Sequence, residues 1–200
     1  MVAKNLKKGK EYFGNLKNIG VLSLVVVGIV LMLIGSVNAY SGGGGTCYCG
    51  NANTILGGSA TDACVDCSAA LNDNTRCANR VNYIGTVPIN NRTETCIDNP
   101  PNFNNKIFDC QGNTIDGNGA GDGIYLNGKS NNTIRNCIIT DFYHGIEFQS
   151  VNSSLIENNT ISKITAYGVV LHLYSKSVVV RNNHIFQSSV WNIPIRRQWK

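Results

Sequence analysis

Acidic and histidine side chains recur near the predicted turns of the second half of the chain, and they are the residues best suited to chemistry. Asp141 and His144 flank one turn, Glu147 follows on the next strand, and Asp122 precedes an equivalent glycine. A glycoside hydrolase needs two carboxyl groups roughly 5–10 Å apart, which Asp122 with Asp141 or Glu147 would supply. We favour the alternative that they are solvated turn residues, because a sequence shows no perturbed environment. Asp122, His144 and Tyr167 are expected to stack in one column.

Metal binding has weaker support, and we assign no metal or other cofactor. The glycine-rich segment from Asp116 to Asp122 offers oxygen ligands of the kind that Ca²⁺ prefers, but it lacks the complete EF-hand spacing. A plain glycine-rich loop is therefore the favoured interpretation. His144, His172 and His184 are not expected to share a column, which argues against a copper site.

The elements that must position these residues repeat about every 22 residues. An apolar-x-Asn-x-x-apolar pattern occurs three times, with offsets of 22 and 24. A Gly-apolar-x-apolar pattern starts at Gly123, Gly145 and Gly168, with offsets of 22 and 23. Two interleaved patterns that keep one period are typical of a solenoid.

The spacing of apolar residues indicates a β-solenoid with corners. Ile156 and Ile161 are five residues apart, so both reach the core only if the chain turns a corner between them. Asn tolerates the left-handed conformation that such a corner needs. We therefore predict one corner per coil at Asn136, Asn158 and Asn182, whose side chains would form an amide ladder between coils. The repeated glycines are expected to mark the next corner.

The segment Phe108–Gly117, followed by these repeats, resembles the right-handed parallel β-helix proteins of the pectate-lyase-like fold. The resemblance covers about residues 104–187, and it is strongest to repeat proteins of exported microbial and archaeal type. It implies sugar-polymer binding, sugar-polymer cleavage or a purely structural stalk. The Asn-Thr-Asp, Asp-Asp and Gly-His-Gly segments of the family's pectin hydrolases do not occur here, which weakens the enzyme interpretation.

Eight cysteines lie beyond residue 40, and six of them fall in residues 47–96. An even number in an exported chain indicates disulfides, although eight cysteines allow 105 pairings. We favour disulfides over a zinc site or a redox C-x-x-C, because C-x-C is tighter than the usual zinc spacing. The eight residues are Cys47, Cys49, Cys64, Cys67, Cys77, Cys96, Cys110 and Cys137. Nearby, we expect a short helix over 63–71 and a strand over 81–89.

The first 39 residues have the features of an export segment. Five lysines and one glutamate precede an uncharged apolar run over residues 19–35. A short segment that ends in the small residue Ala39 follows it. This pattern fits a cleaved signal peptide or an uncleaved membrane anchor, and both place the remainder outside the cytoplasm. The formal net charge is +5, of which +4 lies in residues 1–39. The nearly neutral remainder excludes nucleic acid as an expected partner.

Asparagine sequons add a further expectation for an exported chain. Those at Asn91, Asn131 and Asn152 are predicted sites of glycosylation, whereas Asn158 is assigned to the ladder instead. Low charge (14%) and 21 glycines also favour a turn-rich β protein over a helical bundle.

The resulting prediction is an all-β, right-handed parallel β-helix of about four coils with a cysteine-rich cap and an N-terminal export or anchor helix. We expect a structural or adhesive cell-surface module that contacts polysaccharide without cleaving it. A polysaccharide lyase or hydrolase, and an inactive fragment of a longer surface protein, are the alternatives. The expected segments are an export segment (1–39), a linker (40–46), a cap (47–103), the β-helix (104–187) and a tail that abandons the repeat (188–200).

Overall fold

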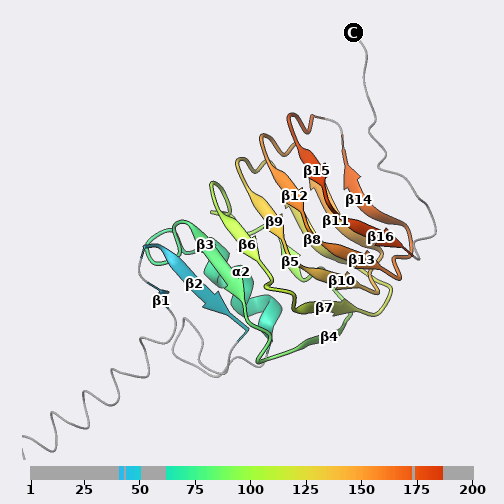
Figure 1. Cartoon of the computed structure of the whole chain (residues 1–200), viewed down its shortest axis with the longest axis horizontal. Helices are drawn as coiled ribbons and strands as arrows, with labels where there is room; N and C mark the ends of the chain where they lie inside the picture. Colours follow the sequence, from blue (N-terminus) through green and yellow to red (C-terminus); the bar gives the residue numbers. More distant parts are fainter. Residues whose placement is uncertain (1–40, 43, 51–61, 173, 187–200) are drawn as a thin grey trace, which may run out of the picture. The chain divides into compact units, whose positions relative to one another are not determined.

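The strands of the protein wind into a parallel β-solenoid. The computed structural model describes residues 41–42, 44–50, 62–172 and 174–186. From Arg80 onward, strands that follow one another in sequence lie in three different sheets, and each pairs with the equivalent strand of at least one neighbouring coil. Figure 1 shows the equivalent strands of successive coils side by side. The predicted mainly β solenoid of about four coils is thus confirmed.

Each sheet collects one strand from every coil. The first sheet contains β1 (Ser41–Gly42), β2 (Thr46–Cys49), β3 (Arg80–Tyr83), β6 (Ile107–Asp109), β9 (Thr133–Arg135), β12 (Leu155–Glu157) and β15 (Val179–Arg181). The second sheet contains β4 (Ile89–Arg92), β7 (Thr114–Gly117), β10 (Ile138–Thr140), β13 (Thr160–Ser162) and β16 (His184–Phe186). The third sheet contains β5 (Ile97–Asp98), β8 (Asp122–Asn127), β11 (His144–Gln149) and β14 (Tyr167–Leu171).

The core consists of aliphatic ladders that run from coil to coil. In the third sheet, the register aligns Ile124, Ile146 and Val169, as the repeat predicted, and all three are buried. Burying one such side chain stabilises the fold by about 1.5–3 kcal/mol. The first sheet contributes the ladder Val81, Phe108, Ile134, Ile156 and Val180, and the second contributes Ile89, Ile115, Ile139, Ile161 and Ile185.

The asparagine corners form as predicted, but the amide ladder lies one residue further along. Asn136, Asn158 and Asn182 have φ values of 53°, 54° and 55°, which is the left-handed conformation. Their side chains do not build the predicted ladder: Asn158 is exposed, and Asn136 donates to Asp109 Oδ1 at 2.9 Å. At the last two of these corners the following residue, Asn159 or Asn183, donates its side-chain amide to a neighbouring coil instead, whereas at the first corner it is the disulfide-bonded Cys137.

Asn159 is the clearest member of this displaced ladder. It is 1% exposed, and its Oδ1 accepts from the backbone N–H of Cys137 at 2.9 Å. Its Nδ2 donates to Ile134 O at 3.2 Å and to Asn183 Oδ1 at 2.9 Å. Buried backbone groups that the corner leaves without strand partners are satisfied in this way.

The repeated glycines are required by the lack of space for a side chain, not by unusual backbone angles. Gly123, Gly145 and Gly168 are absent from the residues with positive φ. A Cβ at Gly145 would collide with the carbonyl of Gly168 and would lie 2.6 Å from Ile161 Cγ2. The prediction that they mark a corner is wrong, because each is the second residue of its strand. The solenoid needs glycine here because consecutive coils approach too closely for a side chain.

All eight cysteines are paired, as predicted. The disulfides are Cys47–Cys77, Cys49–Cys67, Cys64–Cys96 and Cys110–Cys137. Three of them lie among residues 47–96, and the fourth joins two consecutive coils. Four disulfides are typical of an oxidising, extracellular environment.

The predicted short helix is α2 (Ala63–Asn72), and its two ends are capped by different means. Asp62 accepts from the backbone N–H of Cys64 at 2.9 Å and so caps the N-terminus. At the C-terminus, Lys106 Nζ donates to Leu71 O at 2.6 Å and to Asp73 O at 3.2 Å. Lys106 is 1% exposed. Burial lowers the pKa of its ammonium group, although the charge of Asp73 acts in the opposite direction.

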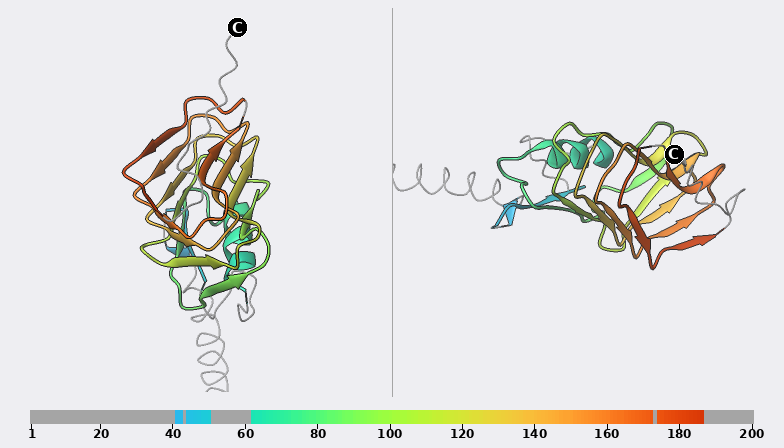
Figure 2. Two further views of the ribbon diagram at one scale, coloured as in Figure 1. Left: turned by 90° about the vertical axis from the view of Figure 1, so that its right-hand side faces the viewer. Right: turned by 90° about the horizontal axis from the view of Figure 1, so that it is seen from above.

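The segment predicted as a cap contains the first coil of the solenoid. β3, β4 and β5 lie one in each sheet and pair with β6, β7 and β8. The predicted single strand over 81–89 is wrong, because β3 ends at Tyr83 and Gly85 has φ 67°. α2 packs against β2, β3 and β5, and Figure 2 shows it beside these first strands.

The glycines predicted as a linker take part in a hairpin. β1 pairs antiparallel with β2, and Gly44 and Gly45 between them have φ values of 79° and 74°. The export segment (1–39) and the C-terminal tail (188–200) lie outside the described residues. Among the residues that are described, no helix has the length and apolarity needed to cross a membrane.

Candidate functional site

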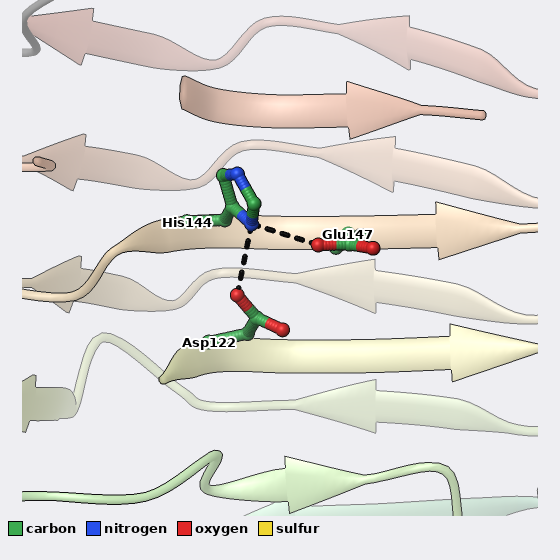
Figure 3. Close-up of side chains that lie close together, drawn as sticks. All are labelled: Asp122, His144 and Glu147. Carbon is green, nitrogen blue, oxygen red and sulfur yellow. Dashed lines mark hydrogen bonds and ion pairs between the residues drawn. The ribbon is translucent and has the colours of Figure 1, made fainter. Parts of the chain in front are cut away.

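Three of the candidate catalytic residues lie together on the outer side of the third sheet. Asp122 begins β8 and His144 begins β11, and the register pairs them with each other. Tyr167 at the start of β14 is the next member, so the predicted column of Asp122, His144 and Tyr167 is observed. Glu147 lies on β11, three residues after His144. Figure 3 shows both carboxyl groups turned toward the imidazole.

The three side chains converge on one imidazole nitrogen. His144 Nδ1 lies 3.0 Å from Asp122 Oδ1 and 2.7 Å from Glu147 Oε2. The side chains of His144, Asp122 and Glu147 are 16%, 17% and 15% exposed, so water reaches the group from one side only. Since Nδ1 carries at most one proton, the two carboxylates compete for a single hydrogen bond.

The electrostatic environment favours a charged imidazole. Burial opposes protonation of His144, but the hydrogen bond and charge of Asp122 and the charge of Glu147 outweigh it, so the pKa of His144 is raised above 6.5. An imidazole whose pKa is raised by two carboxylates is protonated more readily than a free one, so less of it is available as a general base at a given pH.

His172 is a member of the site that the sequence analysis did not assign. It follows β14, and its Nε2 lies 2.9 Å from Glu147 Oε1. His144 and His172 occupy different columns, as expected. Glu147 pairs with Val170, however, and His172 lies two residues further along the same side of the strand. A diagonal neighbour of this kind is within reach of a long side chain. This diagonal position relative to Glu147 is the signal that would have identified His172.

Aromatic rings flank the charged group. The ring of Tyr167 stacks on His144 with a centroid distance of 5.9 Å and an interplanar angle of 22°. The ring of Tyr143 lies 4.5 Å from the same imidazole and is tilted by 60°. On the same side of the sheet, Tyr125 donates its hydroxyl to Gln149 Oε1 at 2.8 Å. The outer face of the third sheet therefore combines rings, amides and carboxylates.

Two other predicted acids lie elsewhere. Asp141 has φ 61° at the turn between β10 and β11, and Asp116 on β7 accepts from the backbone N–H of Asn91 at 3.3 Å. Within the described residues, the side chains whose ligand atoms converge as a metal site would require are those of Asp122, His144 and Glu147. Neither Asp141 nor Asp116 is among them.

The predicted glycosylation sites are all at the surface. Asn91, Asn131 and Asn152 are exposed, and Asn131 donates to Asn105 Oδ1 at 2.9 Å. Glycosylation of these residues stays a prediction. Asn158 is exposed as well. It was left out of the predicted glycosylation sites because it was assigned to the ladder, and its exposure removes that reason.

A shallow hollow lies at the asparagine corners, away from the charged group. It has a volume of about 430 Å³ and is lined by Gln111, Gly112, Asn136, Cys137, Ile138, Asn158 and Thr160. Its lining is neutral, so it has hydrogen-bonding groups but no acid or base.

Residues 102–196 match the family model described as the right-handed β-helix region. This match covers the coils that carry Asp122, His144 and Glu147, and it supports the expected resemblance at the level of fold. No curated protein and no solved structure matches the chain.

Proposed function

We propose that this protein is an exported structural or adhesive module that binds polysaccharide on the outer face of its third sheet without cleaving it. The observation that carries the proposal is the row of outward side chains on β8, β11 and β14. Tyr125, Glu147 and Gln149 lie on neighbouring strands there, beside His144 and Tyr167. The parallel coils place these groups about 4.8 Å apart, so that a chain polymer would meet them repeatedly.

The chemistry of this face suits sugar rings. Tyrosine rings offer flat apolar surfaces with a polar tip, and carboxylates and amides accept or donate hydrogen bonds to hydroxyl groups. Gln149 and Asn127 pair in the register and are both exposed. Tyr125 already donates to Gln149, which holds both side chains in a defined orientation. A pre-ordered face loses little conformational entropy on binding.

The charge of the face favours a neutral polymer. Asp98 is exposed and aligned with Tyr125, and Asp122 and Glu147 lie on the neighbouring strands. These acids would repel a polyanionic chain. Export of the protein is supported by the disulfides and by the sequence of residues 1–39.

Non-catalytic binding is supported by the geometry of His144. A hydrolase uses one carboxyl group as acid and the other as base or nucleophile, with the sugar bond between them. Here an imidazole nitrogen occupies the space between Asp122 and Glu147, at 3.0 and 2.7 Å from the two oxygens.

Retention on immobilised polysaccharides tests this proposal. The full oxidised chain, purified in detergent, is passed over neutral and acidic polymers, and the dissociation constant for each is measured. We expect binding to a neutral polymer that falls at least tenfold in Tyr125→Ala. Tyr48→Ala provides the matched control, since Tyr48 is a partly buried tyrosine on the first sheet. Equal loss in both variants, or no retention of the wild type, would contradict the proposal.

A further inference from the structure

The cluster of Asp122, His144 and Glu147 has the composition of a metal site. Asp122 Oδ1, His144 Nδ1 and a Glu147 carboxylate oxygen lie within 4.8 Å of one another. One imidazole nitrogen with two carboxylate oxygens is a donor set suited to Mn²⁺, Fe²⁺, Co²⁺ or Zn²⁺, because imidazole favours transition ions and carboxylates favour harder ones.

The distances between the ligand atoms also fit. Adjacent ligands of an ion bonded at about 2.1 Å lie about 3.0–3.4 Å apart. Nδ1 of His144 is 3.0 Å from Asp122 Oδ1 and 2.7 Å from Glu147 Oε2, so two edges of such a polyhedron are close to their final length.

The two carboxylates of the cluster contact histidines rather than permanently charged side chains. Over the described part of the chain, the ion pairs of Asp122 and Glu147 are with His144 and His172, and none is with lysine or arginine. A divalent ion bound among these ligands would balance both carboxylate charges.

A fourth residue supports the cluster from outside. The contact from His172 Nε2 to Glu147 Oε1 at 2.9 Å leaves Oε2 directed at His144. Metal-binding carboxylates are commonly held by such a hydrogen bond to the second oxygen. The stacked ring of Tyr167 fixes the plane of His144 in a similar way.

The scaffold beneath these side chains is rigid. Asp122 and His144 are paired across β8 and β11, and each is followed within its strand by a glycine that has no space for a side chain. Sites built on paired strands hold their ligands more accurately than sites on loops.

We propose that Asp122, His144 and Glu147 bind one divalent transition ion, such as Zn²⁺ or Mn²⁺, and that His172 is a positioning residue for Glu147. The three ligands leave the remaining positions of the ion open toward solvent. This centre shares His144 and Glu147 with the face proposed to bind polysaccharide, but it needs no polymer in order to form.

Calorimetric titration tests the centre. The full chain, produced without a histidine tag, oxidised, freed of metal with a chelator and held in detergent, is titrated with Zn²⁺, Mn²⁺ and Ca²⁺ separately. We expect one Zn²⁺ or Mn²⁺ per chain, Ca²⁺ binding at least tenfold weaker, and loss of the site in His144→Gln and in Glu147→Gln. His184→Gln is the matched control, because His184 is an exposed histidine on β16 outside the cluster.

Spectroscopy separates binding from folding. Co²⁺ bound to His144 should give d–d absorption bands that disappear in His144→Gln and are unchanged in His184→Gln. His172→Gln should weaken Zn²⁺ binding by about 10-fold or more while keeping these bands, because His172 positions Glu147 and does not bind the ion itself. Circular dichroism of each metal-free variant verifies that it is folded.

Two results would overturn the proposal. One is wild-type protein that binds no transition ion at millimolar concentration. The other is folded His144→Gln protein that binds Zn²⁺ and Mn²⁺ as tightly as wild type does. Because no polymer is present, either result leaves the polysaccharide proposal standing, and failed polymer retention leaves the metal centre standing.

Discussion

The first coil and the later coils have the same backbone arrangement but are held together differently. The first coil, β3 to β5, is surrounded by the disulfides Cys47–Cys77, Cys49–Cys67 and Cys64–Cys96 and is packed against α2. The later coils contain one disulfide, Cys110–Cys137, and otherwise rely on ladders of isoleucine, glycine and asparagine.

This difference shows what a solenoid needs at its start. A coil within the stack is ordered by a neighbour on each side, and identical residues can repeat because each meets its own copy. In the second and third sheets, the first coil has such a neighbour on one side only, because β4 and β5 are edge strands. Covalent links and a capped helix replace the missing neighbour, and their residues have no reason to repeat.

Reduction of the disulfides should have the largest effect, and it should act mainly on the first coil. Removal of a native disulfide costs about 2–5 kcal/mol, and three of the four lie there. Hydrogen exchange under reducing conditions should therefore show β2, α2 and β3 losing protection before β11 and β12. The double variant Cys110→Ser/Cys137→Ser, which removes the later disulfide alone, should keep the protection of α2. Simultaneous loss in both regions would remove the distinction between them.

Gly145→Ala should be the most damaging single change in the later coils. The added methyl group meets the carbonyl of Gly168 and Ile161 Cγ2, so consecutive coils must separate. We expect a loss of about 3 kcal/mol in the free energy of unfolding, measured with urea. Gly128→Asn is the control, because Gly128 has open space around it and a φ of 66° that asparagine tolerates. Similar losses in the two variants would contradict the close-approach explanation.

Asn159→Ala and Asn158→Gly test the position of the amide ladder at adjacent residues. Asn159→Ala leaves the N–H of Cys137 and the carbonyl of Ile134 without these partners, which should cost about 2 kcal/mol. Asn158 is exposed and has φ 54°, which glycine adopts freely, so Asn158→Gly should change the free energy of unfolding by less than about 0.5 kcal/mol. The reverse order would place the ladder at the corner residue itself.

The smallest expected effect is on acid stability. Burial alone would raise the pKa of Asp109, but hydrogen bonds from Asn136, Gln111 and Arg135 outweigh it and lower the pKa below 3.8. Asp109 therefore stabilises the fold above pH 3.8, and this contribution is lost as the pH falls through the lowered pKa. Urea unfolding at a series of pH values should show a gap between wild type and Asp109→Asn that closes in acid. A constant gap would show that ionisation of Asp109 does not contribute.

The sequence predicted the later coils well because their signals are local and repeated. The alternation around Ile146 and the odd spacing from Ile156 to Ile161 specify which side chains face the core. Repetition favoured Asn158 over Asn159 for the ladder, since the position of Asn158 is asparagine in all three coils whereas that of Asn159 is Cys137 in the first of them. The first coil was predicted as a cap, because β3, β4 and β5 lack the repeat and their disulfide partners depend on tertiary contacts.

The candidate site was predictable in part for the same reason. The shared offset from the glycines placed Asp122, His144 and Tyr167 in one column, and Glu147 lay near them on the same strand. Side-chain direction could not be read from the spacing: Asp141 is as close to His144 in sequence as Glu147 is, but it lies outside the cluster. The contact of His172 with Glu147 depends on a diagonal reach between strands.

The most direct test of the central claim measures binding and cleavage in the same tubes. The full oxidised chain and Glu147→Gln are incubated with neutral polysaccharides, and both the bound protein and the newly formed chain ends are counted. The proposed role predicts retention of the wild type with no new chain ends. New chain ends that appear with the wild type and disappear with Glu147→Gln would contradict it and identify the cluster as a catalytic site.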